Sequence, residues 1–384
     1  MAVWHVLGNE LVSTAAFMGS AAEFDAVAAG GALTLPSGRA LSKADLALGV
    51  TSGDDEPYGM LGDDATAQPR TDFVAIGLNR PLTIQIRHVY TGKYPRAGLL
   101  GFDKKKDLAV VSALKDYAVF AAASRAVNFL KSDVGQHANI SGPTALEEGT
   151  SIVAYQPAVT SDSLTVTIEA AFDNFPKAFT DQIGGAFASA AGVPIFLPWA
   201  GYLMTASAVT KLAGGLADAL FDGRPAFSFT ETLAFNVPGS DIPKADFRIL
   251  CSNTFDPQGL KFDPKRGLVD TETKAPYSGD EPYVVLSLDG AEREKLAAFA
   301  PTLASAAVLQ RFFDMRDGAQ ASVGTVVEGL KLLSDSKYRA DADALAIQIA
   351  KLPAGDPQHA TLKARHVALV KNIASDTLKP AALT

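Results

Sequence analysis

The sequence has a single cysteine, Cys251, among its 384 residues, and it lacks the short motifs that mark common catalytic or metal sites. One cysteine excludes an internal disulfide bond and a zinc site built from cysteines. The five histidines form neither a His-x-x-x-His nor a His-Glu-x-x-His pattern, so a metal-binding histidine pair on one helix is excluded. Neither a phosphate-binding P-loop nor a Gly-x-Ser-x-Gly pattern occurs. The sequence therefore assigns no catalytic and no cofactor-binding residue.

Positive charge is also scarce. The formal net charge is −8 at pH 7, and the longest basic run, 104–106, is flanked by Asp103 and Asp107. A nucleic-acid-binding surface needs a basic stripe or patch, so we expect no nucleic-acid partner. The first residues also lack the basic stretch and apolar segment of a signal peptide, so we expect a cytoplasmic protein.

Hydrophobic residues are abundant and are arranged for β-strands. They make up 48% of the chain against 20% charged residues, which indicates a packed globular protein. Apolar and polar residues alternate in several segments, as is typical of antiparallel strands with one buried face. The segments are Thr83–Val89, Leu164–Ala170 and Phe227–Val237, with shorter candidates at Leu108–Leu114, Ile152–Tyr155, Phe247–Cys251 and Tyr283–Leu288. They predict an α+β protein with an antiparallel β-sandwich-like core.

Glu231 interrupts the clearest of these patterns. It falls on the apolar side of the predicted strand 227–237, where a charged residue is unexpected. We therefore expect a sheet edge, a bulge or a specific partner for Glu231 at this position.

The composition changes along the chain and predicts three regions. Residues 1–72 are expected to form a mixed N-terminal region with an acidic loop, because Asp, Glu, Gly and Pro cluster from Thr51 to Asp72. Residues 73–290 are expected to form the β-rich core, and residues 291–384 an α-helical C-terminal subdomain.

One segment of the core carries no formal charge from Gln182 to Thr210. Apolar residues at helical spacing lie on both sides of a proline-bounded turn, which predicts a buried αα-hairpin insertion over 175–221. A second interpretation is a membrane-inserting hairpin. It is disfavoured, because each half has only about 12 residues between proline or charge and a bilayer-spanning helix needs about 20.

Helical periodicity dominates the C-terminal region. Amphipathic stretches cover Val323–Leu333 and Arg339–Leu352, and a further helix is expected with Asp356 as N-cap and Pro357 at its first position. Each helix has an apolar face that needs a partner, so we expect the helices to form a small helical bundle or to pack against the sheet.

Acidic residues supply the one metal-site hypothesis. The segments Ser52–Tyr58 and Ser278–Tyr283 have nearly the same sequence and are rich in carboxylates. Calcium prefers several carboxylate oxygens, whereas the plainer interpretation is two solvated acidic turns. The candidate calcium ligands are Asp54, Asp55, Asp280 and Glu281.

The second acidic segment runs directly into the predicted strand Tyr283–Leu288. Over about a dozen residues this arrangement resembles the start of a strand in C2 domains, where loop carboxylates bind calcium. The helix expected from Glu292 replaces the strands that would follow in that family, so we do not assign the chain to it.

These observations favour a non-enzymatic protein–protein interaction or assembly component with a protein partner. One alternative is a membrane-active effector that uses residues 182–210. Another is a hydrolase with an unrecognised site, in which Cys251 with His88 or His137 would supply a nucleophile and a base. The apolar run before Cys251 favours a buried structural cysteine instead.

Overall fold

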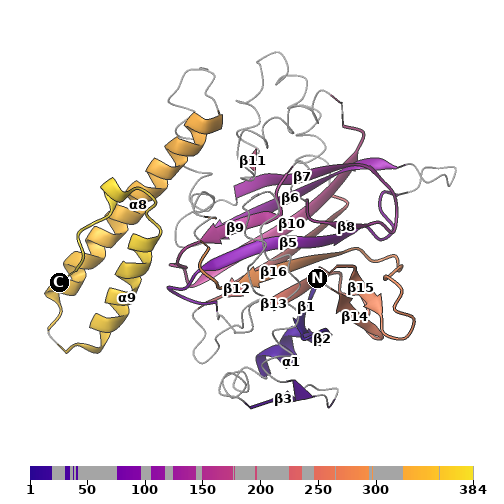
Figure 1. Ribbon diagram of the computed structural model, residues 1–384, viewed down its shortest axis with the longest axis horizontal. Coiled ribbons are helices and arrows are strands. Elements are labelled where there is room, and N and C mark those ends of the chain that lie inside the picture. Colours follow the sequence, from indigo (N-terminus) through magenta and orange to yellow (C-terminus); the bar gives the residue numbers. More distant parts are fainter. Residues whose placement is uncertain are drawn as a thin grey trace, which may run out of the picture.

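The computed structural model describes residues 1–19, 31–34, 38, 40–41, 76–96, 105–116, 124–143, 149–175, 177, 195–196, 225–235, 246–263, 265–293, 296, 323–353 and 355–383. These residues form mostly antiparallel β-sheet, with a helical part at the C-terminal end (Figure 1). This arrangement confirms the prediction of antiparallel strands followed by C-terminal helices.

Nine strands form the larger sheet. Their order is β15-β14-β2-β1-β13-β16-β5-β8, and β9 also pairs with β5. Every neighbouring pair is antiparallel. β1 and β2 come from the region 1–72, and both pair within this sheet. The strands are β1 (Ala2–Leu7), β2 (Glu10–Ser13), β5 (Leu82–Tyr90), β8 (Asn139–Ser141), β9 (Ile152–Gln156), β13 (Asp246–Cys251), β14 (Leu260–Asp263), β15 (Gly267–Asp270) and β16 (Tyr283–Asp289).

Five strands form the second sheet, in the order β11-β7-β6-β10-β12, again with antiparallel neighbours. They are β6 (Lys106–Asp116), β7 (Ser124–Val134), β10 (Ser163–Asp173), β11 (Ile195–Phe196) and β12 (Phe227–Ala234). The short strands β3 (Leu33–Thr34) and β4 (Ala40–Leu41) pair with each other, and α1 (Thr14–Gly19) follows β2.

Hydrophobic side chains from both sheets form one continuous core. Ile84 and Ile86 of β5 come from the larger sheet, and Leu108 of β6 and Ile168 of β10 come from the smaller one; all four are fully buried. Burial of a side chain of this size contributes about 1.5–3 kcal/mol. The alternation that predicts the strands therefore also supplies the main attraction between the two sheets.

A buried ion pair also joins the two sheets. Arg248 of β13 donates from Nη1 to Oε1 of Glu231 in β12, and their side chains are 4% and 10% exposed. Because β12 is the last described strand of its sheet, both the expected edge and the expected partner of Glu231 are confirmed.

A β-bulge in β5 redirects the side chains at the end of that strand. Arg87 has no directly opposite residue in β16, so the inward–outward alternation shifts by one position. Ile86 before the bulge and Val89 after it both face the core shared by the sheets, while Tyr90 joins a second hydrophobic cluster.

The larger sheet curls until its two ends meet. Asn139 in β8 donates from Nδ2 to the carbonyl oxygen of Arg266, which directly precedes β15. The backbone N–H of Leu268 in β15 donates to Tyr283 Oη of β16 over 2.9 Å. The second cluster contains side chains from both ends and from the middle of this sheet, among them Leu268, Cys251 and Tyr283. The curl therefore encloses a core of its own.

The described C-terminal part contains two helices, α8 (Val323–Lys351) and α9 (Pro357–Lys371), followed by the 3-10 turn η3 (Asp376–Leu378). The prediction of separate helices at Val323–Leu333 and Arg339–Leu352 is wrong, because the intervening residues contain no glycine or proline and the helix continues through them. The helical bundle is also a poor description: the described helices of this part form an αα-hairpin.

The predicted start of α9 is confirmed. Asp356 is the N-cap, its carboxylate accepts a 2.8 Å hydrogen bond from the backbone N–H of Gln358, and Pro357 occupies the first position. The apolar stripe of α9 packs on α8 and contributes to a cluster of Tyr338, Ala342, Leu345, Leu369 and Ile373, with Leu362 and Val370 against it.

Asp335 holds the chain after α9 against α8. It is 2% exposed, and its two carboxylate oxygens accept hydrogen bonds from the backbone N–H groups of Ala374 and Ser375 at 2.9 and 2.8 Å. Arg339, one turn further along α8, donates to the carbonyl oxygen of Leu378 at 3.1 Å. The segment that follows α9 is therefore fixed by side chains of α8.

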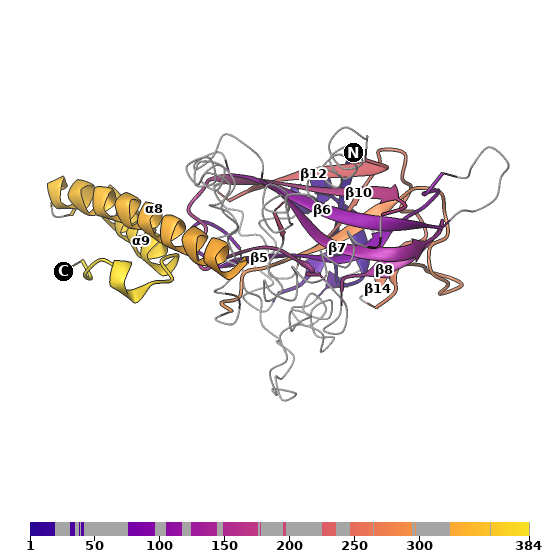
Figure 2. The same ribbon diagram turned by 90° about the horizontal axis from the view of Figure 1, so that it is seen from above.

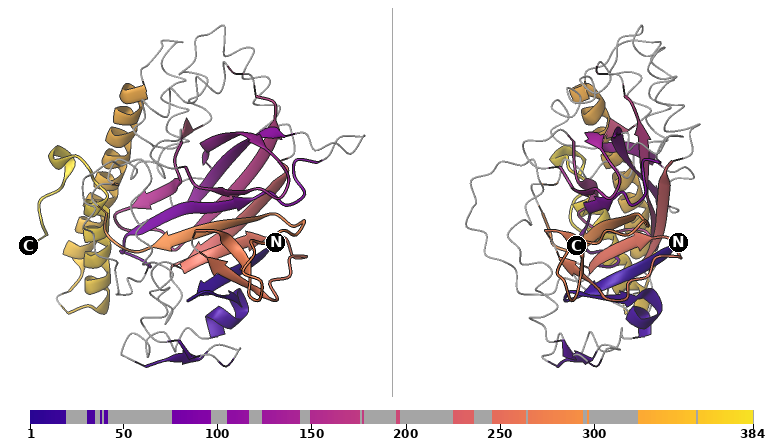
Figure 3. Two further views of the ribbon diagram at one scale, coloured as in Figure 1. Left: turned by 45° about the vertical axis from the view of Figure 1, so that its right-hand side comes forward. Right: turned by 90° about the vertical axis from the view of Figure 1, so that its right-hand side faces the viewer.

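Asn372 fixes the hairpin to the sheets. Its Oδ1 accepts from the backbone N–H of Ala158 at 2.9 Å, and its Nδ2 donates to the carbonyl oxygen of Ala158 at 2.8 Å. Both residues are buried, and Ala158 lies between β9 and β10. Lys371 adds an ion pair to Glu292 at 3.6 Å. Figures 2 and 3 show the hairpin beside the sheets at one end of the strands.

Several predictions lie outside the described residues. Of the predicted hairpin 175–221, the structure describes residues 175, 177 and 195–196, the last two being β11. Asp54 and Asp55 also lie outside the described part of the chain. None of the described helices is both long enough and apolar enough to cross a lipid bilayer.

Candidate functional site

The two described residues of the calcium hypothesis have polar partners of their own. Glu281 accepts a 2.6 Å hydrogen bond from Ser252 Oγ and lies 3.8 Å from Lys93 Nζ. Asp280 Oδ1 lies 3.9 Å from His137 Nε2. No group of three or more His, Cys, Asp or Glu side chains placed to hold a metal occurs within the described ranges.

Tyr90, the last residue of β5, contacts two loops beside these carboxylates. Its hydroxyl donates to the carbonyl oxygen of Gly279 at 2.9 Å and lies 3.1 Å from His137 Nδ1. Its ring stacks on Tyr283 with centroids 5.1 Å apart. Burial raises the pKa of Tyr90 well above its usual value, so this hydroxyl stays protonated and acts as a structural hydrogen-bond donor.

Cys251 lies in the second core and is fully buried. Burial raises the pKa of its thiol to about 12, with a smaller contribution from Glu281, so the nucleophilic thiolate is scarce at neutral pH. His88 of β5 is separated from β13 by β16, which puts two strand spacings of about 4.8 Å each between the two backbones. The burial of Cys251 and its separation from His88 therefore favour a structural role for this cysteine.

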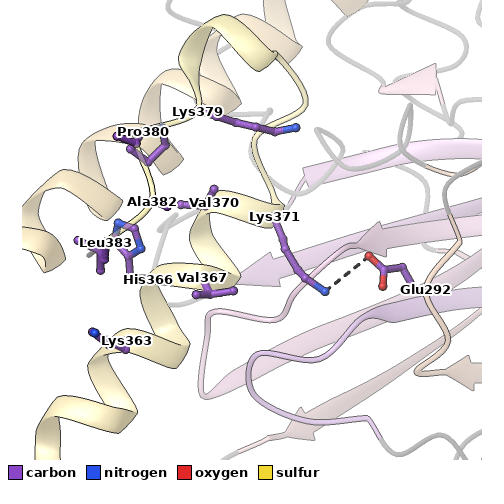
Figure 4. Close-up of a pocket in the computed structure, with 11 residues that line it drawn as sticks. Glu292, Lys363, His366, Val367, Val370, Lys371, Lys379, Pro380, Ala382 and Leu383 are labelled. Atoms are coloured by element: carbon purple, nitrogen blue, oxygen red, sulfur yellow. Dashed lines mark ion pairs between the residues drawn. The ribbon is translucent and has the colours of Figure 1, made fainter.

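The candidate functional site is a pocket between α9 and the segment after η3 (Figure 4). Its volume is about 510 Å³, within the range of about 300–1,000 Å³ usual for ligand sites. Asp335 holds the backbone just before η3, and Arg339 donates to the carbonyl oxygen of Leu378 at its end, so the chain that leads into the pocket is fixed on both sides of η3. Its walls are formed by Glu292, Lys363, His366, Val367, Val370, Lys371 and residues 379–383.

Three lysines give this pocket a positive charge. Lys371 lies 3.6 Å from Glu292, and Lys379 lies 2.7 Å from Asp376, which is exposed and outside the pocket lining. Lys363 forms no ion pair with any described residue. The lining of three lysines and one glutamate carries a formal charge of +2. The helix dipole places about −0.5 charge at the end of α9, which reduces this excess without reversing it.

His366 contributes a buried polar group to the pocket wall. It is 3% exposed, and its Nε2 has no hydrogen-bond partner among the described residues. Figure 4 shows its ring on the side of α9 that faces residues 379–383, the segment after η3 that we call the tail. Burial lowers its pKa, although Asp343 acts in the opposite direction, so the imidazole is neutral at pH 7. A buried polar nitrogen without a partner is costly, and a ligand that supplies a partner gains that energy.

Apolar groups complete the pocket. Val367, Val370, Pro380 and Leu383 line it between the lysines, and Val367 is 54% exposed. Lysines next to apolar side chains suit a ligand with an anionic group and an apolar portion.

The sequence analysis missed this site, although a signal was present. Lys363, His366, Val370 and Lys371 stand at positions i, i+3, i+7 and i+8 of one helix, so they share a face. The tail turns this face into a pocket. The segment that leads to the tail is held by Asp335 and Arg339 of α8, and no local sequence pattern connects these two residues to it.

Comparison with known proteins identifies no relative: no protein-family model, no curated protein and no solved structure matches this chain. A functional assignment therefore rests on the chemistry of the described residues, and within them on the lysine-lined pocket of the helical hairpin.

Proposed function

We propose that this protein is a non-enzymatic interaction component with a sandwich-like β core, and that its helical hairpin binds an acidic segment of a protein partner. The observation that supports this is the pocket between α9 and the tail, which is lined by three lysines and by apolar side chains. Acidic side chains complement the lysines, and neighbouring apolar side chains of the same segment complement Val370 and Leu383.

The attachment of the hairpin suits this role. Asn372 attaches the end of α9 to the sheets, and Asp335 holds the residues that follow it, so α9 is already fixed in place when a partner docks and its ordering costs little conformational entropy. The positive charge of the pocket is opposite in sign to the formal charge of the whole chain, which is −8. Such a chain repels acidic segments except where lysines are concentrated.

A rhodamine-labelled peptide, Ala-Leu-Glu-Glu-Val-Ala, tests the proposal by fluorescence polarization. We expect saturable binding that weakens as salt is raised, because the contacts are between partly exposed charges. The double variant Lys363→Ala/Lys371→Ala should weaken binding by about ten-fold, or roughly 0.7 kcal/mol for each lysine.

Lys351→Ala is the matched control, since Lys351 is an exposed lysine at the far end of the same hairpin. It should leave the dissociation constant unchanged. No saturable binding up to about 1 mM, which corresponds to about −4 kcal/mol, would reject the proposal. Equal binding of the Gln-Gln form of the peptide would reject it too, because the lysines would then contribute nothing.

A further inference from the structure

We infer that the anionic group for which this pocket is built is a phosphate monoester on a side chain of the partner, rather than a carboxylate. This inference rests on the proposed function, since it names the group that the same pocket recognises. Three features of the lining support it: its charge, the type of its cations and the unpartnered nitrogen of His366.

The charge of the lining matches a dianion. Three lysines and Glu292 leave a formal charge of +2. A phosphorylated side chain carries about −1.5 to −2 at pH 7, whereas a single carboxylate carries −1. One phosphate therefore matches the formal charge of the lining side chains, whereas one carboxylate carries half of that charge.

The type of cation also favours phosphate. The described lining contains lysines and no arginine. Carboxylates are recognised best by the planar fork of arginine, which donates two parallel hydrogen bonds. Lysine acts as a compact point charge with three donors that point in different directions, and this suits the three oxygens around a phosphorus atom.

His366 supplies a neutral hydrogen-bonding group beside these charges. Its Nε2 is buried and has no partner among the described residues. In the tautomer with the proton on Nε2, the ring donates to an anionic oxygen. A phosphate offers enough acceptor oxygens to contact the lysines and the imidazole together, whereas a carboxylate has two oxygens to share among four donor groups.

The apolar surface beside the lysines indicates which residues neighbour the phosphorylated side chain in the partner. Val367, Val370 and Pro380 line the pocket next to the lysines, and Val367 and Pro380 remain partly or largely exposed. An apolar residue close to the phosphorylated side chain would cover this surface, so we expect a phosphorylated serine or threonine with an apolar neighbour.

The test compares three peptides on the full-length protein by fluorescence polarization. They are Ala-Leu-X-Gly-Val-Ala with X as phosphoserine or serine, and the Glu-Glu peptide described above. The phosphoserine and Glu-Glu peptides carry a similar total charge, so the comparison isolates the geometry of the anion. We expect the phosphoserine peptide to bind at least about five-fold more tightly than the Glu-Glu peptide, and the serine form not to bind.

Lys363→Ala and Lys371→Ala should each weaken binding of the phosphoserine peptide by about five-fold, with Lys351→Ala as the unchanged control. His366→Phe keeps an aromatic ring at a buried position without the nitrogen, and it should reduce the preference for phosphoserine over Glu-Glu. Melting curves of each variant report whether the fold is retained.

The outcomes distinguish a failure of the inference from a failure of the proposed function. If the Glu-Glu peptide binds as tightly as the phosphoserine peptide, the inference is overturned and the proposed function stands. If neither peptide binds, both are overturned. If the phosphoserine peptide binds equally to the lysine variants, the phosphate is held elsewhere and the inference is again overturned.

Discussion

At the scale of single residues, Glu231 illustrates how a local irregularity in a sequence identifies a long-range contact. A carboxylate on the apolar side of a strand required an explanation, and Arg248 in the other sheet provides it. The sequence predicted a sheet edge, a bulge or a specific partner at this position. It did not predict which residue, because the partner lies on a strand of the opposite sheet.

This ion pair leads to the first prediction. Glu231→Ala leaves the guanidinium of Arg248 buried without its carboxylate, and we expect a loss of about 3–5 kcal/mol in the free energy of unfolding. The double variant Glu231→Leu/Arg248→Met should recover much of that loss, because two apolar side chains need no pairing. Urea unfolding measures both, with Thr232→Ala on the exposed face of β12 as the control. A Glu231→Ala variant as stable as the native protein would contradict the buried pair.

Cys251 leads to a prediction about alkaline pH. Burial raises the pKa of its thiol from 9.0 to about 12, so the unfolded chain releases this proton first as pH rises. Above pH about 9 the unfolded state holds fewer protons, and stability falls by about 1.4 kcal/mol per pH unit for such a group. Burial raises the pKa values of Tyr90 and Tyr283 as well, so the decline should steepen above pH about 10.

Urea unfolding at several pH values between about 8 and 11 measures this decline. Cys251→Ala removes the first of these groups to ionise in the unfolded chain, so the stability of this variant should fall less steeply between pH 9 and 10 than that of the native protein. Parallel curves for the two proteins would show that the thiol ionises with nearly the same pKa in the folded and unfolded states.

At the scale of elements, alternation identified the strands in which one face is clearly buried. β10 and β12 follow the predicted segments and pair in register, with Val166 opposite Glu231. Strand β7 was missed because Asn128, a fully buried polar residue, has no opposite residue in β6 and interrupts the alternation. Its Nδ2 donates to the carbonyl oxygens of Thr150 and Ile152 at 3.4 and 3.1 Å, contacts that the local sequence does not reveal.

The attachment of α9 leads to a prediction for Asn372. Asn372→Ala removes both hydrogen bonds to the buried backbone of Ala158 and leaves those two groups without partners. We expect a loss of about 2–4 kcal/mol in the stability of the hairpin's attachment. Hydrogen exchange should become faster at Ala158 and along α9, while the strands of the larger sheet keep their protection. The same exchange pattern in Asn372→Ala and in the exposed control Ser336→Ala would contradict this role.

At the scale of the whole molecule, the order of the strands could not be predicted. β1 pairs with β2, its neighbour in the sequence, and with β13, in which Cys251 stands opposite Ala2. Local patterns show that a segment is extended and which face is buried. They contain no information about which distant segment supplies the neighbouring strand.

The position of β1 leads to a prediction about truncation. Deleting residues 2–7 removes the strand between β2 and β13 and exposes the core of the curled sheet. We expect loss of the near-UV circular dichroism signal and of cooperative unfolding, together with binding of a hydrophobic dye. Deleting residues 380–384 is the control. It should leave the unfolding transition close to native, because those residues follow the last described helical turn, while peptide binding at the pocket weakens.

The pairing of β1 with β13 also sets the order of events during synthesis. The first strand leaves the ribosome with Val6 and Leu7 exposed, and its neighbour β13 follows only after residue 246. At roughly 5–20 residues per second, this interval lasts about 12–50 s. For that time the nascent chain presents an apolar strand with an unpaired edge, so its yield in a cell should depend on chaperones that bind such segments until translation is complete.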